Sequence, residues 1–137
     1  METEGVFAPE TLADAREAYE SVGPAAQTVV RETATAMDFD GEEYRERVTG
    51  EVVETARDAL FASLLVVYVG DREAFADWRA DAAADVTLLG SEDVDNVVWH
   101  VAPVADAAVA ATYQDERDAA VATCRRAAFG RLYRDEL

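Results

Sequence analysis

The spacing of apolar residues changes along this sequence, and that change constrains the fold class more than any other feature. Up to residue 81, apolar residues recur three or four positions apart, which places them on one face of a helix. From residue 86 they form three short runs, 86–89, 97–102 and 107–113, rich in valine and aromatic residues and bounded by turn-forming residues. A helical stripe returns from Asp115 to about Arg134. Helices, then strands, then a helix predict an α+β fold rather than an alternating α/β fold.

The helical N-terminal half is predicted to contain about four to five helices. Two apolar stripes, Leu12–Val22 and Ala26–Met37, are separated by Gly23-Pro24, a pair that ends one helix and suits the first turn of the next. Asp40 stands where the capping residue of a short third helix is expected.

A fourth stripe begins at Thr49 and becomes apolar on all sides toward its end, which predicts a central helix continuing through Val69. The β-branched run Val66–Val69 could form a strand instead, and the pattern leaves the two open. Asp71 is then the expected cap of a further helix that carries the apolar pair Phe75 and Trp78.

The three short runs predict a three-stranded antiparallel β-meander, because consecutive strands joined by turn residues usually pair with one another. The C-terminal helix, with Asp115 as its cap, is predicted to pack on this sheet. Its apolar stripe consists of Val121, Cys124, Ala128 and Leu132. No linker, repeat or low-complexity run interrupts the sequence, so a single domain over residues 1–137 is expected.

The net charge predicts the salt concentration in which the protein works rather than a catalytic activity. The chain has 29 acidic residues, 12 basic residues that are all arginine, and a net charge of −17. Such a domain repels itself in dilute buffer, whereas at molar salt the Debye length falls to about 3 Å. We therefore predict a halophilic protein whose acidic surface holds water and monovalent cations, and we do not interpret the acidity as a mimic of nucleic acid.

Localisation follows from what the sequence lacks. The N-terminus is acidic where a secretory signal would be basic, and the longest apolar stretch, Ala59–Val69, is about half the roughly 20 residues that a bilayer requires. A single cysteine suits a reducing compartment. A soluble, cytoplasmic protein without a membrane contact is expected.

Several segments resemble a small haloarchaeal family of unknown function. The segments that carry the resemblance are Phe7–Thr11, Gly23–Val30, Val52–Phe61, Val98-Trp99-His100 and Ala128–Arg134. The resemblance covers nearly the whole chain. It implies a haloarchaeal source and no particular activity.

His100 is the only histidine, and strand alternation places it on the face opposite Trp99. If the Trp99 face meets the helices, His100 lies on the open side of the sheet. There it could exchange protons or contact a ligand with Tyr113 nearby, although a structural histidine bonded to backbone is the favoured interpretation. Cys124 falls within the apolar stripe of the last helix and is expected to be a buried, neutral thiol.

No metal or cofactor is predicted. Four carboxylates spaced four apart could form a cation-binding ladder, but a hydrated surface is favoured because no histidine accompanies them; they are Glu73, Asp77, Asp81 and Asp85. Glycine-rich phosphate loops, nucleophile elbows and zinc patterns are absent.

The arginines are unevenly distributed. Residues 1–114 carry 24 acids and 7 arginines, whereas residues 115–137 carry five of each, so the C-terminal end is neutral. Arg125 and Arg126 are therefore candidate contact residues, although complementing the helix dipole together with local ion pairs is the favoured explanation, and the arginines of this helix are expected to scatter around its axis.

These features favour a non-catalytic accessory protein that acts through contact with a protein partner or through self-association. The alternative is a small-ligand-binding protein or enzyme with a pocket between sheet and helices, near Trp99 or His100, Tyr113 and Phe129. A nucleic-acid-binding module is the least favoured class, because the helical half has no basic face.

Overall fold

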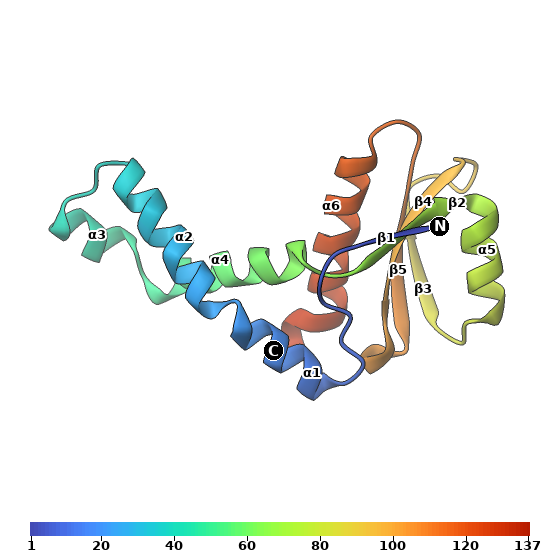
Figure 1. Ribbon diagram of the computed structural model, residues 1–137, viewed down its shortest axis with the longest axis horizontal. Helices are drawn as coiled ribbons and strands as arrows, with labels where there is room; N and C mark the ends of the chain where they lie inside the picture. The colour runs from blue at the N-terminus through green and yellow to red at the C-terminus, as the bar shows by residue number, and fades with distance from the viewer.

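The computed structural model describes residues 1–137. It shows a five-stranded mixed sheet, helices on both of its faces, and a helical arm that extends to one side (Figure 1). The helices are α1 (Leu12–Ser21), α2 (Gly23–Ala36), α3 (Gly41–Arg47), α4 (Gly50–Ser63), α5 (Arg72–Asp81) and α6 (Arg117–Ala128). The strands are β1 (Glu2–Glu4), β2 (Val67–Asp71), β3 (Asp85–Leu89), β4 (Asn96–Ala102) and β5 (Ala107–Tyr113). The α+β class is confirmed, and α6 packs on the sheet as predicted.

The predicted antiparallel meander is wrong, although its three strands lie within a residue of the predicted bounds. The spatial order is β1-β2-β4-β5-β3, and β3 runs parallel to β5 at one edge of the sheet. β4 pairs antiparallel with β5 on one side and with β2 on the other. The place beside β4 that a meander would give to β3 is therefore occupied by β2, a strand from the helical half of the sequence.

The segment Val66–Val69 contains the start of β2, so its interpretation as a helix is wrong and the strand alternative is correct. α4 ends at Ser63, and the chain then extends with Val67 and Val69 turned into the core at 0% and 6% exposure. The N-terminal segment adds to this region, since Val66 N–H donates to the carbonyl of Phe7 at 2.8 Å. β-branched residues with one face buried are better accommodated in a strand than in a helix.

Both faces of the sheet are covered, and this settles where His100 points. Trp99 faces α5, where its ring centroid lies 5.2 Å from that of Phe75 and 5.9 Å from that of Trp78. His100 faces the opposite side, under α6, and is only 1% exposed. The expectation that His100 lies on an open side of the sheet is therefore wrong.

The end of α6 departs from the predicted stripe. Residues 129–133 form one π turn, in which Arg134 N–H donates to the carbonyl of Phe129 five residues earlier. The wider turn brings Tyr133 to the core at 1% exposure, whereas Leu132, predicted on the stripe, is only partly buried. The predicted cap is also wrong: Glu116, not Asp115, occupies the N-cap position, and it makes no side-chain hydrogen bond.

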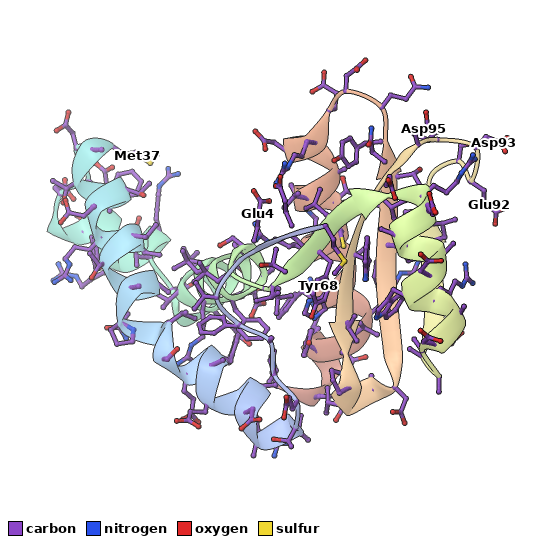
Figure 2. The ribbon with its side chains drawn as sticks, turned by 45° about the vertical axis from the view of Figure 1, so that its right-hand side comes forward. Glu4, Met37, Tyr68, Glu92, Asp93 and Asp95 are labelled. Atoms are coloured by element: carbon purple, nitrogen blue, oxygen red, sulfur yellow. The ribbon has the colours of Figure 1, made fainter.

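The arm consists of α2 packed on α4, with α3 at its far end. The predicted caps are confirmed here, since Asp40 accepts from the amides of Glu42 and Glu43, and Asp71 likewise accepts from Ala74 before α5. Met37, the last residue of the predicted second stripe, lies at the far end of the arm (Figure 2), where it caps α2 and is 59% exposed. None of the helices combines the length and the apolarity that crossing a membrane would require.

Candidate functional site

His100 is part of a buried hydrogen-bonded pair with Tyr133. Its Nδ1 lies 2.6 Å from the carbonyl oxygen of Val66, and because a carbonyl only accepts, Nδ1 carries the proton. Nε2 therefore accepts from the hydroxyl of Tyr133, also at 2.6 Å. Burial lowers the pKa of His100, and the nearby charge of Arg125 lowers it further, while the bond to Val66 opposes the shift. The neutral imidazole links β4 to the C-terminal turn inside the core.

The other reactive side chains of the core are equally enclosed. Cys124 is fully buried with its thiol donating to the carbonyl of Val109 at 3.3 Å, and burial raises the pKa of the thiol to about 12. Trp99 is fully buried beneath α5, and its indole nitrogen has no hydrogen-bond partner. Tyr113 lies opposite Asn96, four strand positions from the partner of His100, so the predicted proximity of Tyr113 and His100 is not observed.

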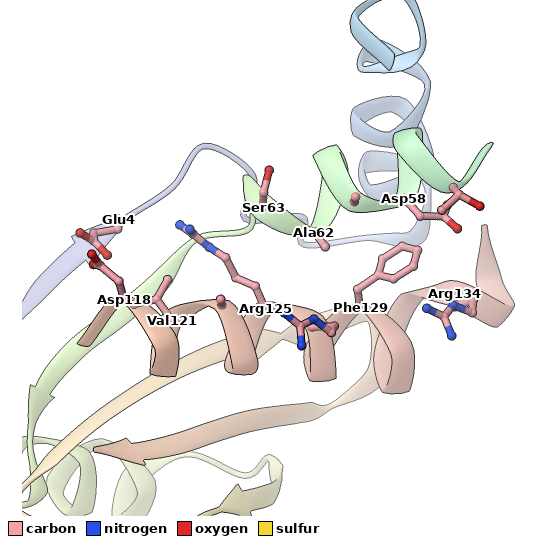
Figure 3. Close-up of a pocket in the computed structure, with 13 residues that line it drawn as sticks. Glu4, Asp58, Ala62, Ser63, Asp118, Val121, Arg125, Phe129 and Arg134 are labelled. Carbon is pink, nitrogen blue, oxygen red and sulfur yellow. The ribbon is translucent and has the colours of Figure 1, made fainter. Parts of the chain in front are cut away.

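An open groove lies between α4 and α6. It has a volume of about 920 Å³. Figure 3 shows Glu4 and Asp118 at one end, Asp58 and Arg134 at the other, and Arg125 and Phe129 between them. Its floor is formed by the small and apolar side chains Ala59, Ala62, Val121, Ala122 and Phe129.

Three arginines line this groove without an ion-pair partner. Arg125, Arg126 and Arg134 all contribute to its wall, yet the only ion pairs of the structure join Arg117 to Glu2 and Glu4. Arg125 is half-buried and its Nε donates to the carbonyl of Leu65 at 2.9 Å. Arg134 lies over the ring of Phe129, with its guanidinium carbon 5.2 Å from the ring centroid. Two of the three guanidinium groups are therefore held in place while their remaining N–H groups are free to donate.

The carboxylates of the groove are largely engaged elsewhere. Glu4 is bound to Arg117 at 3.1 Å. Asp58 accepts from the hydroxyl of Tyr19 at 2.6 Å, and burial together with this bond raises the pKa of Tyr19 to about 12. Asp118 lies in the first turn of α6, where its charge complements the helix dipole. The arginine side of the groove is thus the part available to an incoming anion.

The sequence-predicted site residues are divided between two places. Arg125 and Arg126 line the groove beside Arg134, so the expectation that the arginines scatter around the helix is wrong for these three, whereas Arg131 does not line it. Trp99 and His100 lie inside the two cores, and Tyr113 lines a separate depression. The α4 wall of the groove was missed. Its only signal in the sequence is a stripe of small residues at Thr55, Ala59, Ala62 and Ser63, which looks like an ordinary packing face.

Metal-binding groups are not brought together. No three His, Cys, Asp or Glu side chains are grouped so that they could hold a metal ion. Of the four carboxylates spaced four apart, Glu73, Asp77 and Asp81 lie on α5, whereas Asp85 begins β3 and leaves the helical ladder.

A family model described as a family of unknown function, DUF5809, matches residues 6–134. The chain belongs to this family. The DUF5809 match includes every residue of the groove except Glu4. No curated protein matches the chain, and no solved structure does.

Proposed function

We propose that this DUF5809 protein is a non-catalytic accessory protein of a haloarchaeal cytoplasm, and that it binds an acidic segment of a partner protein in the α4–α6 groove. One observation supports this most strongly. In a chain of net charge −17, three arginines line one groove and none of them has a carboxylate within ion-pair distance.

The spread of the arginines favours an extended ligand. Arg126 and Arg134 are eight residues apart on α6 and its continuation, which corresponds to roughly 12 Å along a helix at 1.5 Å per residue. A single small anion can contact only one end of such a row. An extended peptide covers the same distance in about four residues, so a segment with two or three carboxylates can contact all three guanidinium groups.

The groove is suited to binding in strong salt. Long-range attraction is screened to within about 3 Å at molar ionic strength, so only anions in direct contact with the arginines gain from them. The apolar floor then supplies a larger share of the affinity, because salt screens charge attraction but does not screen the burial of apolar surface. Direct ion pairs above an apolar floor therefore still provide affinity at molar salt, where long-range electrostatic attraction no longer does.

A catalytic role is less well supported because His100 and Cys124 are enclosed. Both ring nitrogens of His100 are engaged, and the Cys124 thiol is fully buried with a raised pKa. The groove volume of about 920 Å³ does fall within the range of small-molecule sites, so a small polyanion is the second candidate ligand.

Fluorescence anisotropy with a labelled hexaglutamate peptide in 1 M and 3 M KCl tests the proposal. We expect saturable binding that the double variant Arg126→Gln/Arg134→Gln weakens by about tenfold or more, since hydrogen bonds to charged groups contribute about 1.5–3 kcal/mol each. Arg131→Gln removes one positive charge, half of the change in the double variant, from the same end of the chain but outside the groove, and should leave the affinity unchanged.

Two results would contradict the proposal. Equal loss of affinity in the Arg131→Gln control would show a general charge effect, and absence of saturable peptide binding would exclude an acidic segment. Tight binding of inorganic phosphate or citrate without binding of the peptide would assign the groove to a small anion instead.

A further inference from the structure

The two edges of the sheet differ in length and in charge. β1 forms the first edge with only three residues, two of which are glutamates held by Arg117 at 2.8 and 3.1 Å. β3 forms the other edge with five residues, and Val86 to Leu89 carry no charge. Charged and very short edge strands are the usual protection against further pairing, whereas β3 is longer than β1 and carries one charge, Asp85, at its start.

After Asp85, the outer strand consists of four uncharged residues, Val86 to Leu89, and its only paired neighbour is β5. The side chains of Val86 and Leu88 are half-buried against the Trp99 side of the sheet, and Thr87 and Leu89 are half-buried on the other side. The outward backbone amides and carbonyls of such a strand can pair with another strand.

We propose that a second copy of the chain pairs antiparallel with this edge, centred on Thr87. In that register Val86 lies opposite the partner's Leu88, and Thr87 lies opposite the partner's Thr87. Asp85 lies opposite the partner's Leu89, so the two aspartates do not face each other. β-branched and aliphatic cross-strand pairs stabilise a sheet, whereas directly opposed like charges destabilise it.

The resulting dimer has closed two-fold symmetry and one continuous sheet of ten strands. The two copies of α5 lie on one face and the two copies of α6 on the other. The α4–α6 groove is on the β1 side of each subunit, away from the β3 edge (Figure 1), so both grooves stay open. Dimerisation is therefore independent of ligand binding in the groove.

Salt decides whether the dimer forms. Two chains of net charge −17 repel each other in dilute buffer, and molar salt screens this repulsion. We expect light scattering to give twice the mass of one chain in 3 M KCl and a falling dimer fraction as KCl is removed. A chain that stays monomeric in 3 M KCl over the accessible concentration range overturns the proposal.

Cysteine crosslinking tests the register. The Cβ atoms of opposed residues are about 4.5–5.5 Å apart, so Thr87→Cys should crosslink efficiently with a one-carbon bis-methanethiosulfonate reagent. In Asp85→Cys, the two introduced thiols are four strand positions apart, roughly 14 Å at 3.4 Å per residue, and should crosslink poorly. The native Cys124 is fully buried and does not compete.

The pattern of crosslinking distinguishes the possible interfaces. Equal yields from Thr87→Cys and Asp85→Cys would indicate random collision and refute the register. Efficient crosslinking of Thr3→Cys on β1 would assign the interface to the other edge and refute the proposal. Circular dichroism of each variant identifies any that has lost its fold, and the light-scattering mass of the unsubstituted chain decides the question in that case.

Discussion

Removal of the Tyr133 hydroxyl should destabilise the protein far more than its size suggests. The hydroxyl donates to His100 Nε2 at 2.6 Å, and both residues are 1% exposed. In Tyr133→Phe the nitrogen keeps its place in the core but loses its donor, and a buried acceptor without a partner costs about 1–3 kcal/mol. For a chain of this length, 1 kcal/mol corresponds to about 4 °C in melting temperature, so a loss of about 4–12 °C is expected.

Thermal unfolding followed by circular dichroism in 3 M KCl measures this loss. Tyr113→Phe removes the same atom from a half-buried tyrosine outside the pair and serves as the control. His100→Leu should cost more, because it also leaves the carbonyl of Val66 unpaired. The double variant should lose about 1–2 kcal/mol less than the sum of the single variants, as expected for groups that interact directly. A Tyr133→Phe melting temperature equal to that of Tyr113→Phe would refute the role given to the pair.

Four further outcomes are expected. Burial lowers the pKa of His100, so below about pH 6.5 the unfolded chain binds a proton at this residue that the folded chain does not. The free energy of unfolding should therefore fall as the pH drops below about 6.5. Equilibrium unfolding of His100→Gln should show a weaker pH dependence. The Cys124 thiol, with its pKa raised to about 12, should react with Ellman's reagent at pH 8 only after denaturation. Gly5 has φ +116°, and a Cβ added there would lie 2.5 Å from the carbonyl oxygen of Leu65, so Gly5→Ala should lower the melting temperature by several degrees. Gly41→Ala, whose added Cβ has nothing within 4 Å, should not lower it. The melting temperature of the unsubstituted protein should fall steadily as KCl is reduced, and an unchanged value in nearly salt-free buffer would contradict the halophilic interpretation.

The candidate site could be predicted only in part. Arg125 and Arg126 were identified from the neutral charge of the C-terminal segment, because charge distribution is readable along a sequence. Arg134 belongs to the same neutral segment, but the arginines of a regular helix were expected to scatter around its axis, whereas Arg134, which follows the π turn at 129–133, lines the same groove. The opposite wall, on α4, is more than 50 residues away in the chain, and no local pattern relates the two.

Local chemistry along the sequence was enough to locate most elements. Asp40 and Asp71 mark helix starts because a carboxylate binds nearby backbone amides within the same turn, whatever the rest of the fold does. The bounds of β3, β4 and β5 follow from short apolar runs between turn residues for the same reason.

Only the tertiary structure decided which of these elements meet. Alternation along β4 places His100 and Trp99 on opposite faces of the sheet, but it does not determine which face α6 covers. That depends on how the helices pack on the two faces. The strand order is set by β2, which lies beside β4 in the sheet. By themselves, its residues Val67 and Val69 are also compatible with a helix, and pairing with β4 and burial in the core select the strand. Contacts between distant segments select among locally equivalent states because burial of apolar surface is the larger free-energy term, and that burial exists only once the segments are assembled.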